Sequence, residues 1–454
     1  MPLRGSAPKF SPDQYEKNFA EISPLMTGRQ AAIEADRCLY CFDAPCTIAC
    51  PTHIDVPAFI KKISTGNLRG SAREILSANV LGHSCGRVCP TEVLCEGACV
   101  MHEKGESPIE IGRLQRYAVE QVLHNNIQLF RPGPFNGKRV ACIGAGPASL
   151  ACAAELAKYG YNVSIYDRNE LPGGLNTYGI AAYKARAADS VREADLVKQL
   201  GVQVCQRFEV GRDISFADLE NQFDAVFIGI GLGETWPLDL PGENLYGVYG
   251  AIEFIEETKT RAFAQVEVGY RVACIGAGNT AIDVVTAARR LGADTVYLIY
   301  RRGEPEMPAF AYEYELAKQD GVSFLWQTQP VRVFGEGGVV TGLGCVRTRL
   351  GSPDAKGRRS PTPIPGTEFR LDVDMVVRAV GQKPTTDLLR AVNGLELNFD
   401  GTVKINDRHQ TGNPKFFAGG DCTNGGKEVV DAVADGMAAA RALDAWLASL
   451  RAAS

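Results

Sequence analysis

The chain has 454 residues, of which 45% are hydrophobic and 22% charged, and its formal net charge is −5. These values are ordinary for a globular protein of about two to four domains, and the acidic balance argues against nucleic acid as a partner. No run approaches the ~18–20 apolar residues that cross a bilayer, and the N-terminus lacks the apolar stretch of a secretory signal. We therefore expect a cytoplasmic protein that binds neither membrane nor nucleic acid.

Cysteines dominate the first part of the chain. Of the fourteen, eight lie between Cys38 and Cys99, where a reducing compartment disfavours a disulfide framework. The two groups are spaced Cys38-x2-Cys41-x4-Cys46-x3-Cys50-Pro51 and Cys85-x3-Cys89-Pro90-x4-Cys95-x3-Cys99. Two compact groups that each contain Cys-Pro are typical of the ligands of two [4Fe–4S] clusters, and they suit zinc less well.

The residues around these cysteines have helical spacing, for example in Val56–Ile63 and Ile111–Val122. We expect residues 1–130 to form an α-helical iron–sulfur domain. A linker rich in Pro and Gly follows at 131–137, and strands then alternate with helices along most of the remaining chain. This alternation predicts an α/β fold with parallel sheets.

The octapeptide Arg-Val-Ala-Cys-Ile-Gly-Ala-Gly occurs twice, at 139–146 and at 271–278, and each copy begins a strand–helix–strand pattern. We expect two Rossmann-like dinucleotide-binding domains, with the second inserted in the first. The predicted strand, helix and strand are 139–143, 147–159 and 163–167 in the first copy and 271–275, 279–291 and 295–300 in the second. The predicted domain bounds are 136–250 with 379–454 for the first domain and 251–378 for the second.

The first fingerprint is Gly144-Ala-Gly146-Pro-Ala-Ser149. Its first glycine permits a tight turn, and its second lets the backbone approach a pyrophosphate at a helix N-terminus. Ser149 stands where Gly or Ala is usual, which weakens the match slightly without excluding it. Asp167 ends the second strand, 21 residues after Gly146, where an acid accepts hydrogen bonds from ribose hydroxyls.

The second fingerprint is Gly276-Ala-Gly278-Asn-Thr-Ala281, and its glycines have the same geometric roles. Asn279 and Thr280 open the following helix, where we expect them near the phosphates of the second dinucleotide.

The second copy has arginines where the first has its acid. Arg301 and Arg302 follow the second strand, and arginine pairs well with a 2′-phosphate, which favours NADP. The alternative is a solvated turn, since Glu304 and Glu306 follow closely and would neutralise both charges. The residues therefore predict NAD(P), with either nucleotide open.

Two further motifs, Pro172-Gly-Gly-Leu175 and Phe417-Ala-Gly-Gly-Asp421, complete a resemblance to two-dinucleotide flavoproteins of the glutathione-reductase type. The resemblance implies FAD in the first domain and NAD(P)H in the second. It implies these residues at the flavin or its ribityl–pyrophosphate region: Gly173, Gly174, Leu175 and Asp421.

The same resemblance makes Lys184 a catalytic candidate, because the stretch that follows the Gly-Gly pair passes close to the flavin. A solvated lysine is the alternative. The active disulfide of that type, Cys-x4-Cys, is missing, and Cys142 and Cys152 do not fit it. Electrons must therefore leave the flavin by another route.

From about Ala31 to about Trp446 the order of motifs resembles the small subunit of bacterial glutamate synthase and the electron-input half of dihydropyrimidine dehydrogenase. In the second family a glutamine of an Ile-Gly-x-Leu-Gln run replaces one cluster cysteine, and Ile111-Gly-Arg-Leu-Gln115 matches that run. Glutamate synthase subunits typically have Glu there. The resemblance implies one cluster on Cys38, Cys41, Cys46 and Cys99 and another on Cys50, Cys89, Cys95 and Gln115. The alternative is that Cys85 is the eighth ligand.

The resemblance implies a NAD(P)H:acceptor oxidoreductase subunit of the dihydropyrimidine dehydrogenase type, with FAD, two [4Fe–4S] clusters and NAD(P)H. Its partner would be an FMN- and iron–sulfur-containing (β/α)8-barrel subunit that binds the pyrimidine, so we expect a hetero-oligomer that interconverts uracil or thymine and 5,6-dihydropyrimidines. One alternative is the small subunit of glutamate synthase, which supplies electrons from NADPH. An alternative of another class is a non-catalytic iron–sulfur redox-sensing module, against which the two intact fingerprints argue.

Overall fold

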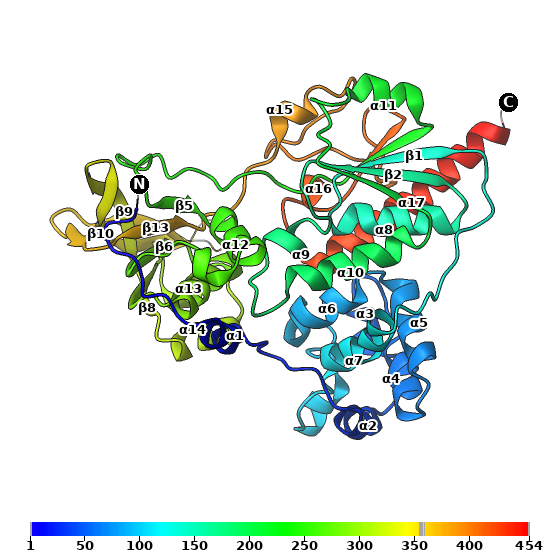
Figure 1. Ribbon diagram of the computed structural model, residues 1–454, viewed down its shortest axis with the longest axis horizontal. Helices are drawn as coiled ribbons and strands as arrows, with labels where there is room; N and C mark the ends of the chain where they lie inside the picture. The colour runs from blue at the N-terminus through cyan, green and yellow to red at the C-terminus, as the bar shows by residue number, and fades with distance from the viewer. Residues whose placement is uncertain (1, 354–356, 358, 453–454) are drawn as a thin grey trace. The chain divides into compact units, whose positions relative to one another are not determined.

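The computed structural model describes residues 2–353, 357 and 359–452, without the side chains of 451 and 452 (Figure 1). Contacts divide the chain into two compact units. The inserted unit comprises the residues up to Glu21, Tyr178–Tyr183 and Glu234–Lys383, and the main unit comprises the rest. No helix in the described part of the chain is long and apolar enough to span a bilayer.

The cysteine-rich part of the main unit is a layer of short helices. Caps fix where they begin: the Thr27 and Gln30 side chains exchange hydrogen bonds with the backbone in a capping box, and Asp55 accepts the Ala58 amide. Their apolar faces bury Phe59, Ile75 and other side chains in one core. The elements are α2 (Gly28–Asp36), α3 (Pro45–Ile48), α4 (Val56–Ser64), α5 (Leu68–Ala78), α6 (Gly82–Val88), η1 (Thr91–Val93), η2 (Val100–Lys104) and α7 (Ile111–His124).

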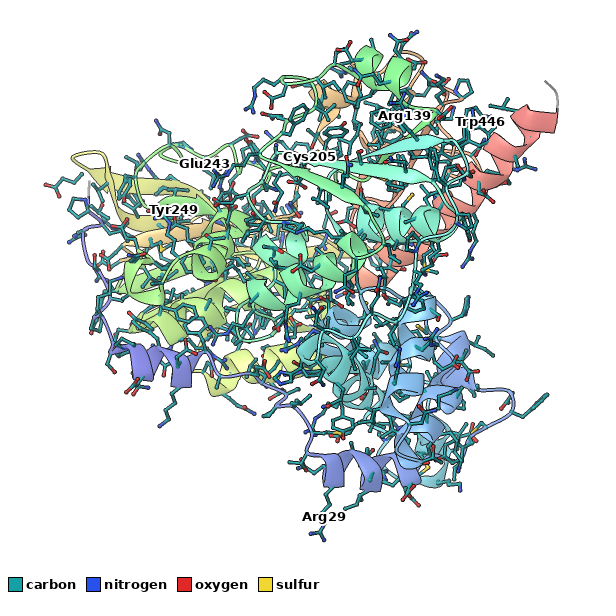
Figure 2. All side chains as sticks on the ribbon, turned by 45° about the vertical axis from the view of Figure 1, so that its right-hand side comes forward. Arg29, Arg139, Cys205, Glu243, Tyr249 and Trp446 are labelled. Carbon is teal, nitrogen blue, oxygen red and sulfur yellow. The ribbon has the colours of Figure 1, made fainter. Side chains whose placement is uncertain are left out.

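The rest of the main unit is a parallel five-stranded sheet with the order β14-β4-β1-β2-β3. Helices α8 and α17 lie side by side against it (Figure 1). Trp446 of α17, labelled in Figure 2, contacts Phe417 of β14, and their ring centroids are 5.8 Å apart. The elements are β1 (Arg139–Ile143), α8 (Pro147–Lys158), β2 (Asn162–Asp167), α9 (Leu175–Tyr178), α10 (Ala187–Lys198), β3 (Gln203–Gln206), α11 (Phe216–Gln222), β4 (Ala225–Ile228), α15 (Thr386–Leu389), β14 (Phe416–Ala418), α16 (Asp421–Asn424) and α17 (Val429–Ala452).

The inserted unit repeats this architecture with a parallel sheet of order β5-β13-β6-β7-β8. A separate antiparallel group pairs β10 with β9, β11 and β12. The elements are β5 (Val248–Gly250), α12 (Ala251–Thr260), η3 (Phe263–Gln265), β6 (Arg271–Ile275), α13 (Asn279–Leu291), β7 (Thr295–Ile299), η4 (Glu304–Glu306), α14 (Ala311–Gln319), β8 (Ser323–Leu325), β9 (Thr328–Glu336), β10 (Val339–Pro353), β11 (Arg359–Pro363), β12 (Phe369–Leu371) and β13 (Met375–Arg378).

These elements confirm the predicted α/β class, the helical N-terminal layer and the insertion of one dinucleotide fold in the other. Several predicted domain bounds differ. The inserted unit also takes in residues 178–183, 234–250 and 379–383, which were predicted in the first dinucleotide-binding domain. The residues up to Glu21, predicted within the iron–sulfur domain, group with the inserted unit. The reason is apolar contact, because α1 (Pro12–Asn18) buries Tyr15, and Phe19 stacks on Phe263 with ring centroids 4.0 Å apart.

A buried charge network joins the helical layer to α10 within the main unit. His83 Nε2 lies 2.7 Å from Glu120, and Arg192 donates to Glu120 at 3.0 Å and to Asp189 at 2.6 Å. The hydrogen bond with His83, followed by the charges of His83 and Arg192, lowers the pKa of Glu120 to about 2. The helices that carry the cysteines are therefore fixed to the dinucleotide-binding layer by ionised groups.

Candidate functional site

The first cysteine group lies on a loop with an unusual backbone. Tyr40 and Ala44 have φ of +52° and +37°, values that side chains other than glycine rarely adopt. Such turns persist only where the surroundings hold them, and they are common at ligand sites. Here they curl the chain between α2 and α3.

The curled loop and α3 bring Cys38, Cys41 and Cys46 to one small cavity, and Cys99 reaches it from the start of η2. The remaining walls come from α4, η2 and the start of α7. The cysteines in its lining are Cys38, Cys41, Cys46 and Cys99, the set expected for one cluster. Burial raises the pKa of Cys38 and raises that of Cys46 to about 11. Binding a metal here would therefore release protons.

A second cavity holds the other predicted set, Cys50, Cys89, Cys95 and Gln115, and also Cys85. The buried Gln115 amide donates from Nε2 to the carbonyl of Gly82 at 2.6 Å. This bond fixes which end of the amide is the nitrogen, so the oxygen remains as the atom that would bind iron.

Cys85 is the competing eighth ligand, and the structure places it in the same lining. Its sulfur accepts a hydrogen bond from Asn79 Nδ2 at 3.2 Å, and it also hydrogen-bonds to Cys89, which together with burial raises the pKa of Cys89. Asn79 was not among the predicted residues, and no sequence motif singles it out. The choice between Cys85 and Gln115 stays a prediction.

Both cavities fit a four-iron cluster, because four predicted ligands line each of them. Among the described residues, no group of three or more His, Cys, Asp or Glu side chains is gathered closely enough to hold one metal ion. A [4Fe–4S] cluster takes one thiolate at each iron, so its ligands surround a volume instead of a point. Each cavity is lined in this way, largely by apolar residues besides the ligands.

The first glycine fingerprint forms the turn between β1 and α8. Gly144 has φ of +88°, and a side chain there would lie 2.7 Å from the carbonyl oxygen of Gly229. Ser149 fits the third position because it faces Gly229, and its hydroxyl donates to the Ile143 carbonyl at 3.4 Å. Asp167 accepts the Ala145 amide at 2.5 Å, so the buried carboxylate also braces the turn.

The Gly-Gly pair and the late aspartate belong to the same unit. Gly174 has φ of +56° and would place a side chain 2.8 Å from the Cα of Gly146, so two bare backbones meet beside the turn. Gly173 donates to the Ala145 carbonyl at 2.8 Å, and Leu175 begins α9. Asp421 begins α16, and burial raises its pKa. The structure thus brings the three flavoprotein motifs into one unit, with the roles of their residues still predicted.

The second fingerprint forms the turn between β6 and α13 of the inserted unit. Gly276 has φ of +133° and would clash with the Ala379 carbonyl at 2.2 Å. A side chain at Gly278 would meet no atom within 4 Å, which leaves room for a phosphate beside the first turn of α13. Asn279 accepts the Phe310 amide at 3.0 Å, and Thr280 follows it in the first turn.

The two arginines follow β7, as predicted. Arg302 donates to the carbonyl of Arg359 at 3.2 Å, and the Arg301 side chain is exposed. The carboxylates expected to compete with them have other partners, since Glu306 accepts the Gly303 amide at 3.0 Å and Glu304 hydrogen-bonds to Tyr314. The cationic turn therefore suits a phosphate.

Lys184 is buried in the main unit, and its charge acts on Glu428. Burial is the larger effect and raises the pKa of Glu428. Glu428 precedes α17, and Lys427 donates its amide to Asp421 at 3.3 Å. The lysine thus lies near the flavin-motif aspartate in this unit, and its catalytic role stays a prediction.

Val430 is a further residue that the sequence did not single out. It belongs to the first turn of α17, a helix of the dinucleotide-binding layer, yet it lines the second cysteine cavity. The cavity of Cys38 and Cys41 has no such neighbour among its lining residues. The second cavity therefore lies against the chain that carries Asp421, and the first lies within the helical layer.

The chain matches two family models. One, described as dihydropyrimidine dehydrogenase domain II with a 4Fe-4S cluster, covers residues 15–127, and the other, pyridine nucleotide-disulphide oxidoreductase, covers residues 138–436. The glutamate synthase (NADPH) small chain of Escherichia coli is 36% identical over 94% of this chain and 94% of its own. The chain belongs to the glutamate synthase small-subunit-like family of FAD and iron–sulfur oxidoreductases.

Other members of this family differ in length. The NADPH-Fe(3+) oxidoreductase subunit beta of Geobacter sulfurreducens is 36% identical over 95% of this chain and 68% of its own. Among solved structures, FprA from Mycobacterium tuberculosis in complex with NADPH is 20% identical over 71% of this chain and 86% of its own, with a TM-score of 0.58. The thioredoxin reductase of T. acidophilum is also 20% identical, with a TM-score of 0.52 over 69% of this chain and 99% of its own. These structures confirm the fold class.

The membership confirms the coarser family expectation, an oxidoreductase with FAD, NAD(P)H and [4Fe–4S] cofactors. It does not confirm the dihydropyrimidine dehydrogenase type. The near-full-length relatives include glutamate synthase small chains, so the comparisons favour the alternative over the first expectation.

Proposed function

We propose that this chain is an electron-input subunit that takes electrons from NADPH and delivers them through two [4Fe–4S] clusters to a partner chain. The observation that carries the proposal is the pair of cysteine-lined cavities, one of which includes Val430 of the helix that follows the flavin motif. NADPH is preferred to NADH because Arg301 and Arg302 lie after β7, and because the E. coli and Geobacter relatives are named for NADPH.

The chemistry explains why both kinds of cofactor site occur in one chain. A nicotinamide nucleotide gives up two electrons as a hydride, iron–sulfur clusters accept one at a time, and a flavin converts between the two. The residues of this chain supply positioning. The glycine turns hold the two dinucleotides, and the thiolates hold the iron.

The linings of the two cavities also support an order of transfer. A cluster held by Cys50, Cys89, Cys95 and Gln115 would receive electrons first, because Val430 of α17 lines its cavity. A cluster held by Cys38, Cys41, Cys46 and Cys99 would receive them next, because the residues that line its cavity all belong to the helical layer. The partner then accepts them one at a time.

The direct test uses anaerobically purified chain. It should contain FAD and iron and should oxidise NADPH with ferricyanide. Cys89→Ser should lower the iron content to about half, whereas Cys205→Ser, a thiol of β3 outside both cavities, should leave it unchanged. Equal iron in the two variants, or no NADPH oxidation by the wild type, would contradict the proposal.

The first candidate for the end use is pyrimidine reduction, with an FMN- and iron–sulfur-containing (β/α)8-barrel subunit as the partner in a hetero-oligomer. Gln115 supports it, because the glutamine of the resembling run lies in the cluster cavity with its amide oriented by Gly82. The isolated chain should leave uracil untouched and should support its reduction only with the barrel subunit added. Turnover of uracil by this chain alone would contradict the division of labour.

The second candidate is supply of electrons to glutamate synthase, which the comparisons favour. The support is 36% identity over 94% of both chains with the E. coli small chain. Mixing the chain with a barrel subunit or with a glutamate synthase large chain separates the two. NADPH-dependent dihydrouracil formation supports the first candidate, and glutamate formation supports the second.

A further inference from the structure

Large apolar side chains are exposed around the first cysteine group. Phe42 is 107% exposed, Ile48 68% and Leu39 48%, whereas most apolar residues of the helical layer are buried in its core. Scattered apolar residues are normal on a surface, but Phe42 of the loop and Ile48 of α3 line one hollow and form a patch there. Patches of this kind mark interaction sites.

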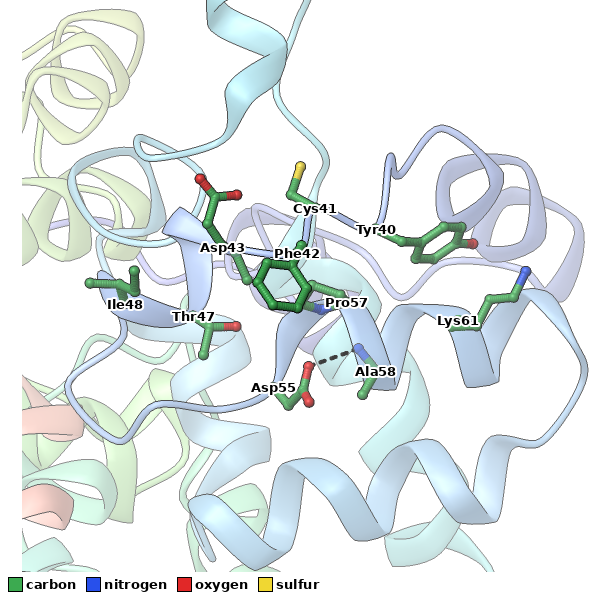
Figure 3. A pocket seen from close by; sticks show the side chains of 11 residues that line it. Tyr40, Cys41, Phe42, Asp43, Thr47, Ile48, Asp55, Pro57, Ala58 and Lys61 are labelled. Atoms are coloured by element: carbon green, nitrogen blue, oxygen red, sulfur yellow. Dashed lines mark hydrogen bonds between the residues drawn. The ribbon is translucent and has the colours of Figure 1, made fainter.

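The patch surrounds an open hollow of about 630 Å³. Figure 3 shows the Phe42 ring in the middle of the lining side chains, with Ile48 and Asp43 on one side and Lys61 on the other. Asp55 also lines the hollow, so two carboxylates face it. The single cation, Lys61, lies over the Tyr40 ring at 4.8 Å, away from the carboxylates in Figure 3.

The hollow adjoins the first iron–sulfur cavity. Cys41 and Pro57 line both, so a molecule seated in the hollow touches a predicted iron ligand directly. The left-handed residues Tyr40 and Ala44 lie in the same loop. Among the described residues, none from the dinucleotide-binding layer lines the hollow. The hollow is therefore the surface through which a partner would reach the cavity of Cys38, Cys41, Cys46 and Cys99.

We propose that this hollow is the seat of the electron-accepting partner subunit. The partner inserts an apolar side chain beside Phe42 and Ile48 and presents a basic side chain to Asp43 and Asp55. The partner's one-electron acceptor then lies next to Cys41. Oxidation of one NADPH to NADP⁺ releases two electrons and one proton. The two electrons reduce the partner in two successive one-electron steps, and the proton passes to solvent. The proposal rests on the proposed function, because it needs electrons to leave through the first cluster.

The chain offers a matched control for a test. Phe399 is 108% exposed but lies in the dinucleotide-binding layer outside the hollow. An affinity-tagged chain is purified from its own cells as wild type, Phe42→Glu and Phe399→Glu. We expect the wild type and Phe399→Glu to purify with one redox subunit and to reduce it with NADPH. In Phe42→Glu the amount of copurified partner and the rate of its reduction by NADPH should each fall at least about tenfold, because the new carboxylate is placed in the apolar hollow and faces Asp43.

A second variant guards against a local disruption of the loop. Ile48→Glu changes another exposed residue of the hollow and should give the same loss with unchanged iron content. A wild-type chain that purifies alone or as a homo-oligomer, or variants that still reduce the partner within twofold of wild type, would overturn the proposal.

Two readouts separate this proposal from the proposed function. Iron content and NADPH–ferricyanide activity report the input half, and all variants should match the wild type in both. Their absence from the wild type would refute the proposed function. Their presence together with unimpaired transfer in Phe42→Glu and Ile48→Glu would refute the docking surface alone.

Discussion

Gly278 offers a test of the nicotinamide-nucleotide site because its missing side chain faces open space. The residue caps α13 with φ of −84°, which an alanine adopts freely, and a Cβ there meets no atom within 4 Å. Gly276 provides the contrast. Its φ is +133°, and a Cβ would lie 2.2 Å from the Ala379 carbonyl oxygen. One substitution fills ligand space, and the other strains the fold.

The magnitudes differ accordingly. Gly278→Ala should change the free energy of unfolding by at most about 1 kcal/mol, the usual cost of alanine at a cap. The added methyl displaces a phosphate from the amides of α13, and a hydrogen bond to a charged group contributes about 1.5–3 kcal/mol. The Kd for NADPH should therefore rise by about 10- to 150-fold. Gly276→Ala should lower the free energy of unfolding by about 1–3 kcal/mol through backbone strain.

The assay is titration calorimetry of NADPH with thermal unfolding measured on the same samples. Gly351→Ala, at an exposed position of β10 in the same unit, is the control and should leave the Kd and stability unchanged. FAD and iron content should be equal in all samples. An unchanged Kd in Gly278→Ala would refute the placement of the pyrophosphate at this turn.

Three further substitutions test the main unit. Metal analysis should find the iron of both clusters in Cys85→Ala but only the iron of the first cluster in Gln115→Ala. Loss of iron in Cys85→Ala and full iron in Gln115→Ala would make Cys85 the ligand. Gly229→Ala, whose Cβ would lie 2.3 Å from the Ser149 hydroxyl, should lower the free energy of unfolding by about 1–3 kcal/mol and release FAD. Ser149→Gly in the same chain should restore part of both, because the Cβ would still lie 2.9 Å from the Phe227 ring. Glu120→Gln should lower the free energy of unfolding at pH 7 by about 2–3 kcal/mol. The pKa of Glu120 is lowered from 4.5 to about 2 in the folded protein, so the wild type should lose this stabilisation as the pH falls from 4.5 to 2. The same loss of unfolding free energy over this pH range in Glu120→Gln would contradict the role of the carboxylate.

Local chemistry made the glycine turns and their flanking strands predictable from the sequence. Strands 139–143 and 271–275 have the predicted bounds, because each joins an apolar run to a glycine turn that only one backbone path satisfies. Helix α17 begins at Val429 and extends to Ala452. Its continuation depends on packing against α8, which the sequence pattern does not contain.

Contacts between distant segments were not predictable in the same way. The linings of the two cavities agree with ligand sets taken from family resemblance, but the neighbours Asn79 and Val430 have no motif. Ser149 looked like a weakened match, and it fits because Gly229, far along the chain, has no side chain. The exposure of the Phe42 side chain likewise depends on how the loop packs against α3 and α4. Such facts belong to the packed structure.

Electron transfer through this chain requires four-iron clusters in the two cavities. The most direct test of their presence is anomalous diffraction at the iron edge from crystals of the anaerobically purified chain. We predict two compact iron peaks, one among Cys38, Cys41, Cys46 and Cys99 and one beside Gln115, whose amide oxygen contacts an iron. Iron in neither cavity, or single ions bound to individual thiols, would contradict the electron path from the dinucleotide sites to the partner.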